Sequence, residues 1–157
     1  MSLTVPVGSD HQLARLLQIG IVLEEVVEAR STRHARRADE LEEGVEQLLE
    51  AAATESATHR ERLEELLAEL DADTVPFEEI ERLVEAQYEA DEAFDGILYD
   101  QLCNEETAYK FYDDVIEAIE ASDVTFSVDR ERVLETLVDI REDEADGVED
   151  VTRLMEQ

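Results

Sequence analysis

Apolar and polar residues alternate along most of this chain with the spacing of three to four positions that is typical of amphipathic helices. Few glycines and prolines, five and two in a chain of 157 residues, interrupt the pattern and divide it into segments. The pattern predicts four long helices and one shorter helix, over residues 10–37, 40–71, 76–90, 91–121 and 127–156. Long helices joined by a tight first turn and a longer middle connection are typical of a four-helix bundle with a crossover. We therefore expect a single all-α domain over residues 1–157, with helix 76–90 as the crossover between the second and third long helices.

Capping residues mark where these helices begin. Ser9 is followed three residues later by Gln12, and this capping-box pattern predicts the start of the first helix. Asp39 is expected to open the second long helix in the same way, and Ser127 to cap the last one. Residues 124–128, with the sequence VTFSV, are the one segment whose pattern indicates an extended chain.

Each long helix carries an acidic residue near its middle, in line with its own apolar stripe. In the second long helix the stripe has a gap, and steps of three or four residues through this gap land on Glu55 and His59. The stripes of the other long helices bracket further glutamates, namely Glu24 and Glu28 in the first, Glu105 in the third and Glu144 in the fourth. If the four helices pack together, carboxylates from all of them are expected to meet at a similar depth.

Ionised carboxylates in an apolar interior are costly unless they are paired, so this arrangement needs an explanation. One explanation is that the side chains lie at the edge of each stripe and reach water, or that they pair with arginines such as Arg62 and Arg141. The other is that two divalent cations neutralise them, since inward-facing arginines are too few to do so. His59 is compatible with either explanation, as a hydrogen-bonded core histidine or as a ligand.

One stretch of the third long helix carries a recognisable motif. The sequence NEETAYKFYDDVIEAIE, from Asn104 to Glu120, resembles the third helix of rubrerythrin-like and ferritin-like proteins. Its Glu-x-x-Ala-x-x-Phe-Tyr pattern falls on Glu105, Ala108, Phe111 and Tyr112. The sequence EARSTRHA, residues 28–35, repeats this pattern weakly, and DEADGVEDV, residues 143–151, looks like the fourth helix of the same superfamily.

The resemblance implies a ferritin-like four-helix bundle that holds two iron or manganese ions per chain. The ligands that it implies in this sequence are Glu28, Glu55, Glu105 and Glu144, and we expect His59 to assist them from the same helix face as Glu55. Tyr112 is expected to be a core aromatic residue and, by resemblance, a redox or hydrogen-bonding neighbour of the metals. The chain departs from the family pattern at Thr58 and Gly147, which stand where the histidines of two Glu-x-x-His motifs are usual. His59 comes one position after Thr58 and keeps to the same helix face as Glu55.

Two functions are compatible with these features. In the first, the protein is a ferritin-like, rubrerythrin-like metal protein that oxidises iron(II) or reduces oxygen or peroxide. It would take electrons from a separate donor protein, because a single cysteine cannot form a rubredoxin-type module. In the second, the bundle has lost its metal centre and acts as a structural or protein-interaction module. Whether the protein is an enzyme stays open between the two.

The net charge of the chain indicates the salt concentration in which we expect the protein to work. The sequence has 44 acidic and 13 basic residues, for a formal net charge of −31, and the acids are spread over every helical segment. Self-repulsion on this scale destabilises a compact state unless salt screens it, and the Debye length falls to roughly 3 Å at molar salt. The interpretation that we favour is a cytosol of very high salt, as in a haloarchaeon-type organism.

The composition also narrows the range of partners. Binding to nucleic acid is not expected, because phosphate contacts need clusters of lysine and arginine. No apolar run reaches the length of a membrane span and the N-terminus lacks the pattern of a leader peptide, so we expect a cytoplasmic protein without membrane contact. The apolar breadth of IGIVLEEVV, residues 19–27, suggests a homo-oligomer such as a dimer.

Overall fold

The computed structural model describes residues 6–36, 43–89 and 96–156. These residues form five helices and, within the described ranges, no strand. The helices are α1 (Asp10–Arg36), α2 (Glu43–Glu69), α3 (Phe77–Glu89), α4 (Ile97–Glu120) and α5 (Arg130–Met155). The prediction of an all-helical protein is therefore confirmed. In the described part of the chain no helix is both long enough and apolar enough to cross a membrane.

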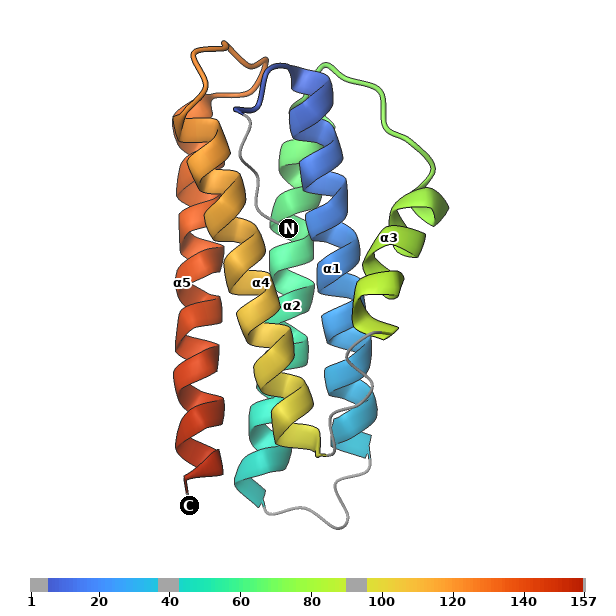
Figure 1. Cartoon of the computed structure of the whole chain (residues 1–157), viewed down its shortest axis with the longest axis vertical. Coiled ribbons are helices and arrows are strands. Elements are labelled where there is room, and N and C mark those ends of the chain that lie inside the picture. Colours follow the sequence, from blue (N-terminus) through green and yellow to red (C-terminus); the bar gives the residue numbers. More distant parts are fainter. Residues whose placement is uncertain (1–5, 37–42, 90–95, 157) are drawn as a thin grey trace.

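The four long helices lie side by side along the long axis of the molecule (Figure 1). α1 packs mainly against α2 and α4 mainly against α5, while α2 with α5 and α1 with α4 form smaller contacts that join the two pairs. α2 and α4 run in the same direction (Figure 1), and α3, which stands between them in the sequence, packs against α1. Each long helix thus faces an interior that the other three share.

The start of α5 differs from the prediction. Asp129, not Ser127, is the N-cap of this helix, and its side chain accepts a hydrogen bond from the Glu131 N–H at 3.1 Å. The prediction of Ser127 as the cap was wrong because its hydroxyl has another role. Ser127 Oγ accepts a hydrogen bond of 2.8 Å from the Asp71 N–H, which ties the end of α2 to the α4–α5 connection.

The start of α1 agrees with its capping pattern. Ser9 Oγ accepts a hydrogen bond from the Gln12 N–H at 3.2 Å, and Gln12 Oε1 accepts one from the Gly8 N–H at 2.6 Å. Asp39, the cap expected for the second long helix, lies outside the described residues. Residues 124–128 form no strand; instead Phe126 and Val128 are buried against the helical core.

The interior changes in character along its length. At the end where α1 and α5 begin it consists of closely packed aliphatic side chains, including Leu13, Leu17, Ile21, Leu63, Leu66, Val115, Ile119, Val133, Leu137 and Ile140. Towards the other end, where Val45, Leu49 and Val151 are also buried, polar and charged side chains enter the interior. They are Glu24, Ser31, His34, Ser56, His59, Asp100, Gln101, Asn104, Glu105 and Glu144, and all are buried. This polar end holds the candidate site.

Candidate metal centre

Side chains from all four long helices converge in the polar end of the interior. α1 provides Glu24, α2 provides Glu55 and His59, α4 provides Glu105, and α5 provides Glu144. Ligand atoms of Glu24, His59 and Glu144 all lie within 4.8 Å of one another, and so do those of Glu55, Glu105 and Glu144. Because Glu144 belongs to both groups, the five side chains form one connected cluster that could hold metal ions.

The cluster is almost completely removed from solvent. Glu24 is 1% exposed, His59 2% and Glu144 3%, whereas Glu55 is half-buried. Isolated charges at this depth are strongly disfavoured, so the carboxylates need protons, hydrogen bonds or cations. The idea that these acids reach water from the edge of their stripes therefore does not hold for the most buried of them.

Arginines do not neutralise the cluster either. Arg62, which the sequence offered as a partner, binds Asp139 at 3.2 Å, and Arg141 binds Asp113 at 2.8 Å. Both pairs are partly exposed, and the acids that they involve are not members of the cluster. The positive group that does lie among the carboxylates is the imidazole of His59.

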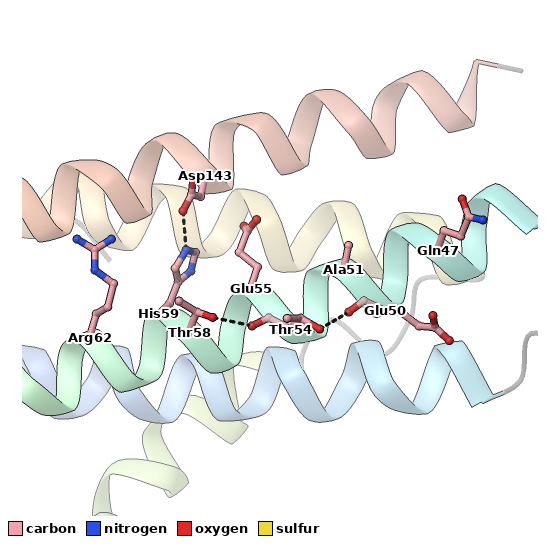
Figure 2. Close-up of a pocket in the computed structure, with 9 residues that line it drawn as sticks. All are labelled: Gln47, Glu50, Ala51, Thr54, Glu55, Thr58, His59, Arg62 and Asp143. Atoms are coloured by element: carbon pink, nitrogen blue, oxygen red, sulfur yellow. Dashed lines mark hydrogen bonds and ion pairs between the residues drawn. The ribbon is translucent and has the colours of Figure 1, made fainter.

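His59 lies between the inner carboxylates and the surface. Its Nε2 atom is 2.9 Å from Asp143 Oδ2 on α5 (Figure 2). Its Nδ1 atom faces inward, 3.2 Å from Glu144 Oε1 and 3.4 Å from Glu24 Oε1, without the alignment of a hydrogen bond to either. Burial by itself lowers the pKa of His59, but the surrounding carboxylates of Glu144, Glu24 and Asp143 outweigh it and raise the pKa to about 11.

The pKa values of the carboxyl groups are raised as well, but for them burial is the cause of the rise. Burial raises the pKa of Glu55 to about 7, with His59 opposing the rise and nearby acids adding to it. Burial also raises the pKa of Glu105 and, more strongly, that of Glu144. Without a metal, the cluster therefore retains protons at neutral pH. A divalent cation would take the place of those protons and keep the ligands ionised.

Several atoms of the cluster are buried without a hydrogen-bond partner. They are Glu24 Oε2, His59 Nδ1 and Glu105 Oε2. The second oxygen of each carboxylate is held in place: the Tyr112 hydroxyl donates to Glu24 Oε1 at 2.6 Å, and Gln101 Nε2 donates to Glu105 Oε1 at 3.0 Å. One oxygen is thus fixed by the protein while the other stays available, which is the arrangement that metal ligands require.

Gly147 stands on α5 where the sequence resemblance suggests a histidine, and the Glu105 carboxyl group lies against it. A Cβ atom at this residue would lie 2.5 Å from Glu105 Oε2 and 2.6 Å from Glu105 Cδ. Because the Glu105 carboxyl group fills the space next to the glycine, no side chain fits there without moving it. On α2 the other departure, Thr58, is exposed and donates its hydroxyl hydrogen to Thr54 O at 3.2 Å, so the imidazole comes from His59 alone.

The structure brings together most of the residues singled out in the sequence. Glu55, His59, Glu105 and Glu144 lie in the cluster, and the fully buried Tyr112 lies beside it. Glu28 does not: it is half-buried and accepts a hydrogen bond of 2.6 Å from Arg60.

α1 contributes Glu24 in the place of Glu28, one turn earlier. Both glutamates bracket the broad apolar stripe of α1, and the family pattern placed the ligand at Glu28. Asp143 is a further residue that the sequence did not single out. The sequence signal that could have identified Asp143 is its position next to Glu144, on a face of the last helix that the second long helix could approach.

A second ionic cluster lies next to the first but is internally paired. Asp100 on α4 binds Arg30 through two hydrogen bonds and lies 2.6 Å from His34 Nε2. Burial alone would raise the pKa of Asp100, but His34 and Arg30 together lower it to about 2. This cluster joins α1 to α4, and because its acid is paired with basic groups, we interpret it as a structural ion pair.

Comparisons with models of known protein families, with curated proteins and with solved structures found no match to this chain.

Proposed function

We propose that this protein is a ferritin-like four-helix bundle that binds two divalent metal ions, iron or manganese, in its interior. The observation that carries the proposal is the convergence of four glutamates and one histidine in a nearly dry space. Three buried ligand atoms there have no hydrogen-bond partner. Buried polar groups in native proteins are nearly always satisfied, so a concentration of unsatisfied donor and acceptor atoms points to a missing ligand.

The two overlapping groups suggest how the ligands are shared. One ion would be held by Glu24, His59 and Glu144, and the other by Glu55, Glu105 and Glu144. A set of carboxylates with one imidazole favours iron(II) or manganese(II) over metals that prefer sulfur. When bound, such ions would supply the redox chemistry for oxidising iron(II) with oxygen or peroxide, or for reducing oxygen or peroxide with electrons from a separate donor protein.

The surrounding residues would orient the metal ligands through hydrogen bonds. Loss of the Nδ1 proton from His59 would free that atom to bind metal, while its Nε2–H would donate to Asp143 and fix the ring. Tyr112 would hold Glu24, and Gln101 would hold Glu105, each in one orientation. The large negative charge of the chain fits the proposed high-salt cytosol, where salt screens repulsion between the remaining surface acids.

An alternative function is a structural or interaction module derived from such a bundle. Two observations favour it: the cluster has one histidine, and the Glu105 carboxyl group already fills the space beside Gly147. In this alternative, the raised pKa values of Glu55, Glu105 and Glu144 favour the neutral carboxyl groups, which lowers the cost of burying them without a metal.

Metal binding at equilibrium separates the two functions. The protein would be purified in molar salt, incubated with manganese(II) or iron(II), freed of unbound metal and analysed for metal content. We expect two ions per chain for the native sequence and a clear loss for Glu105→Gln. Glu106→Gln is the matched control, because Glu106 is the neighbouring exposed acid on α4 and should leave the metal content unchanged. A native protein that retains no metal would overturn the metalloprotein and favour the structural module.

A further inference from the structure

The seam between α2 and α5 is open beside the cluster. Two cavities lie along it, with volumes of about 570 Å³ and about 370 Å³. They share four lining residues, Gln47, Ala51, Glu55 and Asp143, and so form one continuous depression, which we call the α2–α5 groove. Figure 2 shows part of this groove, with the α2 side chains lying beneath Asp143 of α5.

Small residues account for the groove. α2 meets α5 over a smaller interface than it forms with α1. The lining includes Gly44, Ala51, Ala52 and Gly147, whose side chains are too short to close the gap. Gly147 matters most, since the missing side chain at this position leaves the Glu105 carboxyl group as the floor of the smaller cavity.

Residues of the cluster line the groove. Glu105 is 5% exposed, its Oε2 atom is buried without a partner, and the residue lines the smaller cavity. His59 and Glu55 line the larger cavity, where Asp143 joins them to form a third group of ligand atoms within 4.8 Å of one another. The Asp143 side chain is 46% exposed, so this third group connects the solvent to the buried ligands.

The charge of the lining favours cations. Besides the cluster residues, the acids Glu50, Asp146 and Asp150 line the groove. Of the two lining arginines, Arg62 is paired with Asp139 and Arg153 with Asp150. A cleft lined mainly by one sign of charge concentrates ions of the opposite sign and raises their rate of association.

We propose that the α2–α5 groove is the path by which a divalent cation reaches the buried cluster, with the carboxylates of Glu55 and Asp143 as its first binding position. This inference rests on the proposed metal binding. It adds a prediction that metal binding by itself does not make: residues that are not ligands, but that line the groove, control the rate of uptake and leave the final metal content unchanged.

Two sets of variants test the path. Ala51→Met places an unbranched side chain in the groove without changing a charge or a ligand, and its control is Ala29→Met, at an exposed alanine of α1. Asp146→Asn combined with Asp150→Asn removes two lining charges. Its control is Glu142→Gln combined with Glu149→Gln, at exposed acids of α5 that do not line the groove.

Manganese(II) is the probe, because the paramagnetic resonance signal of the free ion disappears on binding and so reports both rate and stoichiometry. We expect Ala51→Met to slow uptake by about tenfold or more. The double asparagine variant should slow uptake by about tenfold at the lowest salt that keeps the fold, with the difference vanishing at molar salt. Both controls should match the native rate, and all five proteins should bind the same amount of metal at equilibrium.

The outcomes test the proposed entry path separately from the proposed metal binding. Full metal content with unchanged rates in both groove variants would overturn the path and leave the metal-binding function standing. A native protein that binds no manganese(II) would overturn both.

Discussion

Buried polar side chains have different hydrogen-bond partners at the two ends of the helical interior. In the apolar end, the few buried polar side chains bond to the backbone: Gln18 donates to Val75 O, Ser122 to Val7 O and Thr136 to Arg132 O. In the polar end, acids, amides and imidazoles face one another across the interior. Among the described residues, every buried side-chain nitrogen or oxygen without a hydrogen-bond partner lies here, on Glu24, His34, His59, Asn104 and Glu105.

The contrast indicates that the two ends serve different purposes. A buried polar group without a partner costs about 1–3 kcal/mol, so a fold under selection for stability alone would replace such groups with aliphatic residues. The apolar end shows that the same four helices can pack in that way. Concentrating the cost at one end is what is expected of a functional site supported by a stable scaffold.

The largest effect should come from a cavity in the apolar end. Leu137→Ala removes a side chain that is 1% exposed and should lower the free energy of unfolding by about 3 kcal/mol, from lost burial and an unfilled space. Denaturant unfolding in molar salt measures the change, and Glu135→Ala, at an exposed position of the same helix, is the control. A loss below about 1 kcal/mol would mean that the apolar end is not the stabilising scaffold.

The paired ionic cluster should give the next largest effect, and it should depend on pH. The folded pKa of Asp100 is about 2, below its usual value of 3.8, so its contribution is complete above about pH 4 and is lost as the pH falls through 2. We expect Asp100→Asn to cost about 2 kcal/mol at neutral pH. This difference from the native protein should shrink on acidification, as followed by unfolding at several pH values. A difference that stays constant down to pH 2 would show that the Asp100 charge is not what stabilises the cluster.

The sequence predicted the apolar end better than the polar end, for a physical reason. Helices of 24 to 27 residues repeat their apolar spacing many times, so their existence follows from periodicity alone. A helix end depends on one or two residues, and the competition between Ser127 and Asp129 was decided by a contact with Asp71, which is distant in the sequence.

Site residues could be predicted where the apolar periodicity of their own helix determines which way they face, but not where contacts with other helices decide. Glu55, Glu105 and Glu144 lie on stripes with a clear register, and they converge as predicted. On α1 the choice between Glu24 and Glu28 depends on other helices, since Tyr112 of α4 binds the first and Arg60 of α2 binds the second.

Glu105→Gln should change stability in opposite directions with and without metal. The folded pKa of Glu105 is raised, so the carboxyl group destabilises the metal-free fold as the pH rises above the usual range of a glutamate. Without metal, the glutamine variant should therefore be more stable by about 1 kcal/mol at high pH, with the gain shrinking on acidification. With manganese(II) present, the native protein should be the more stable of the two, because metal binds the folded state.

Thermal unfolding with and without manganese(II) measures both differences, and Glu106→Gln should show neither. If the glutamine variant were less stable without metal at every pH, Glu105 would be a stabilising member of a satisfied network. The distinction between the two ends would then be lost.

The smallest effect tests the closest contact in the polar end. Replacing a glycine inside a helix by alanine normally stabilises it by about 1 kcal/mol. For Gly147→Ala this gain should nearly vanish, because the new Cβ atom would lie 2.5 Å from Glu105 Oε2 and displace the carboxyl group. In a Glu105→Ala background the obstacle is gone and the full gain should return, so the double-mutant cycle should give a coupling energy of about 1 kcal/mol.

Gly44→Ala, whose Cβ atom would meet only Leu154 Cδ2 at an ordinary 3.6 Å, should give the same change in both backgrounds. Equal gains for Gly147→Ala in the two backgrounds would show that the Glu105 carboxyl group does not rest on the glycine.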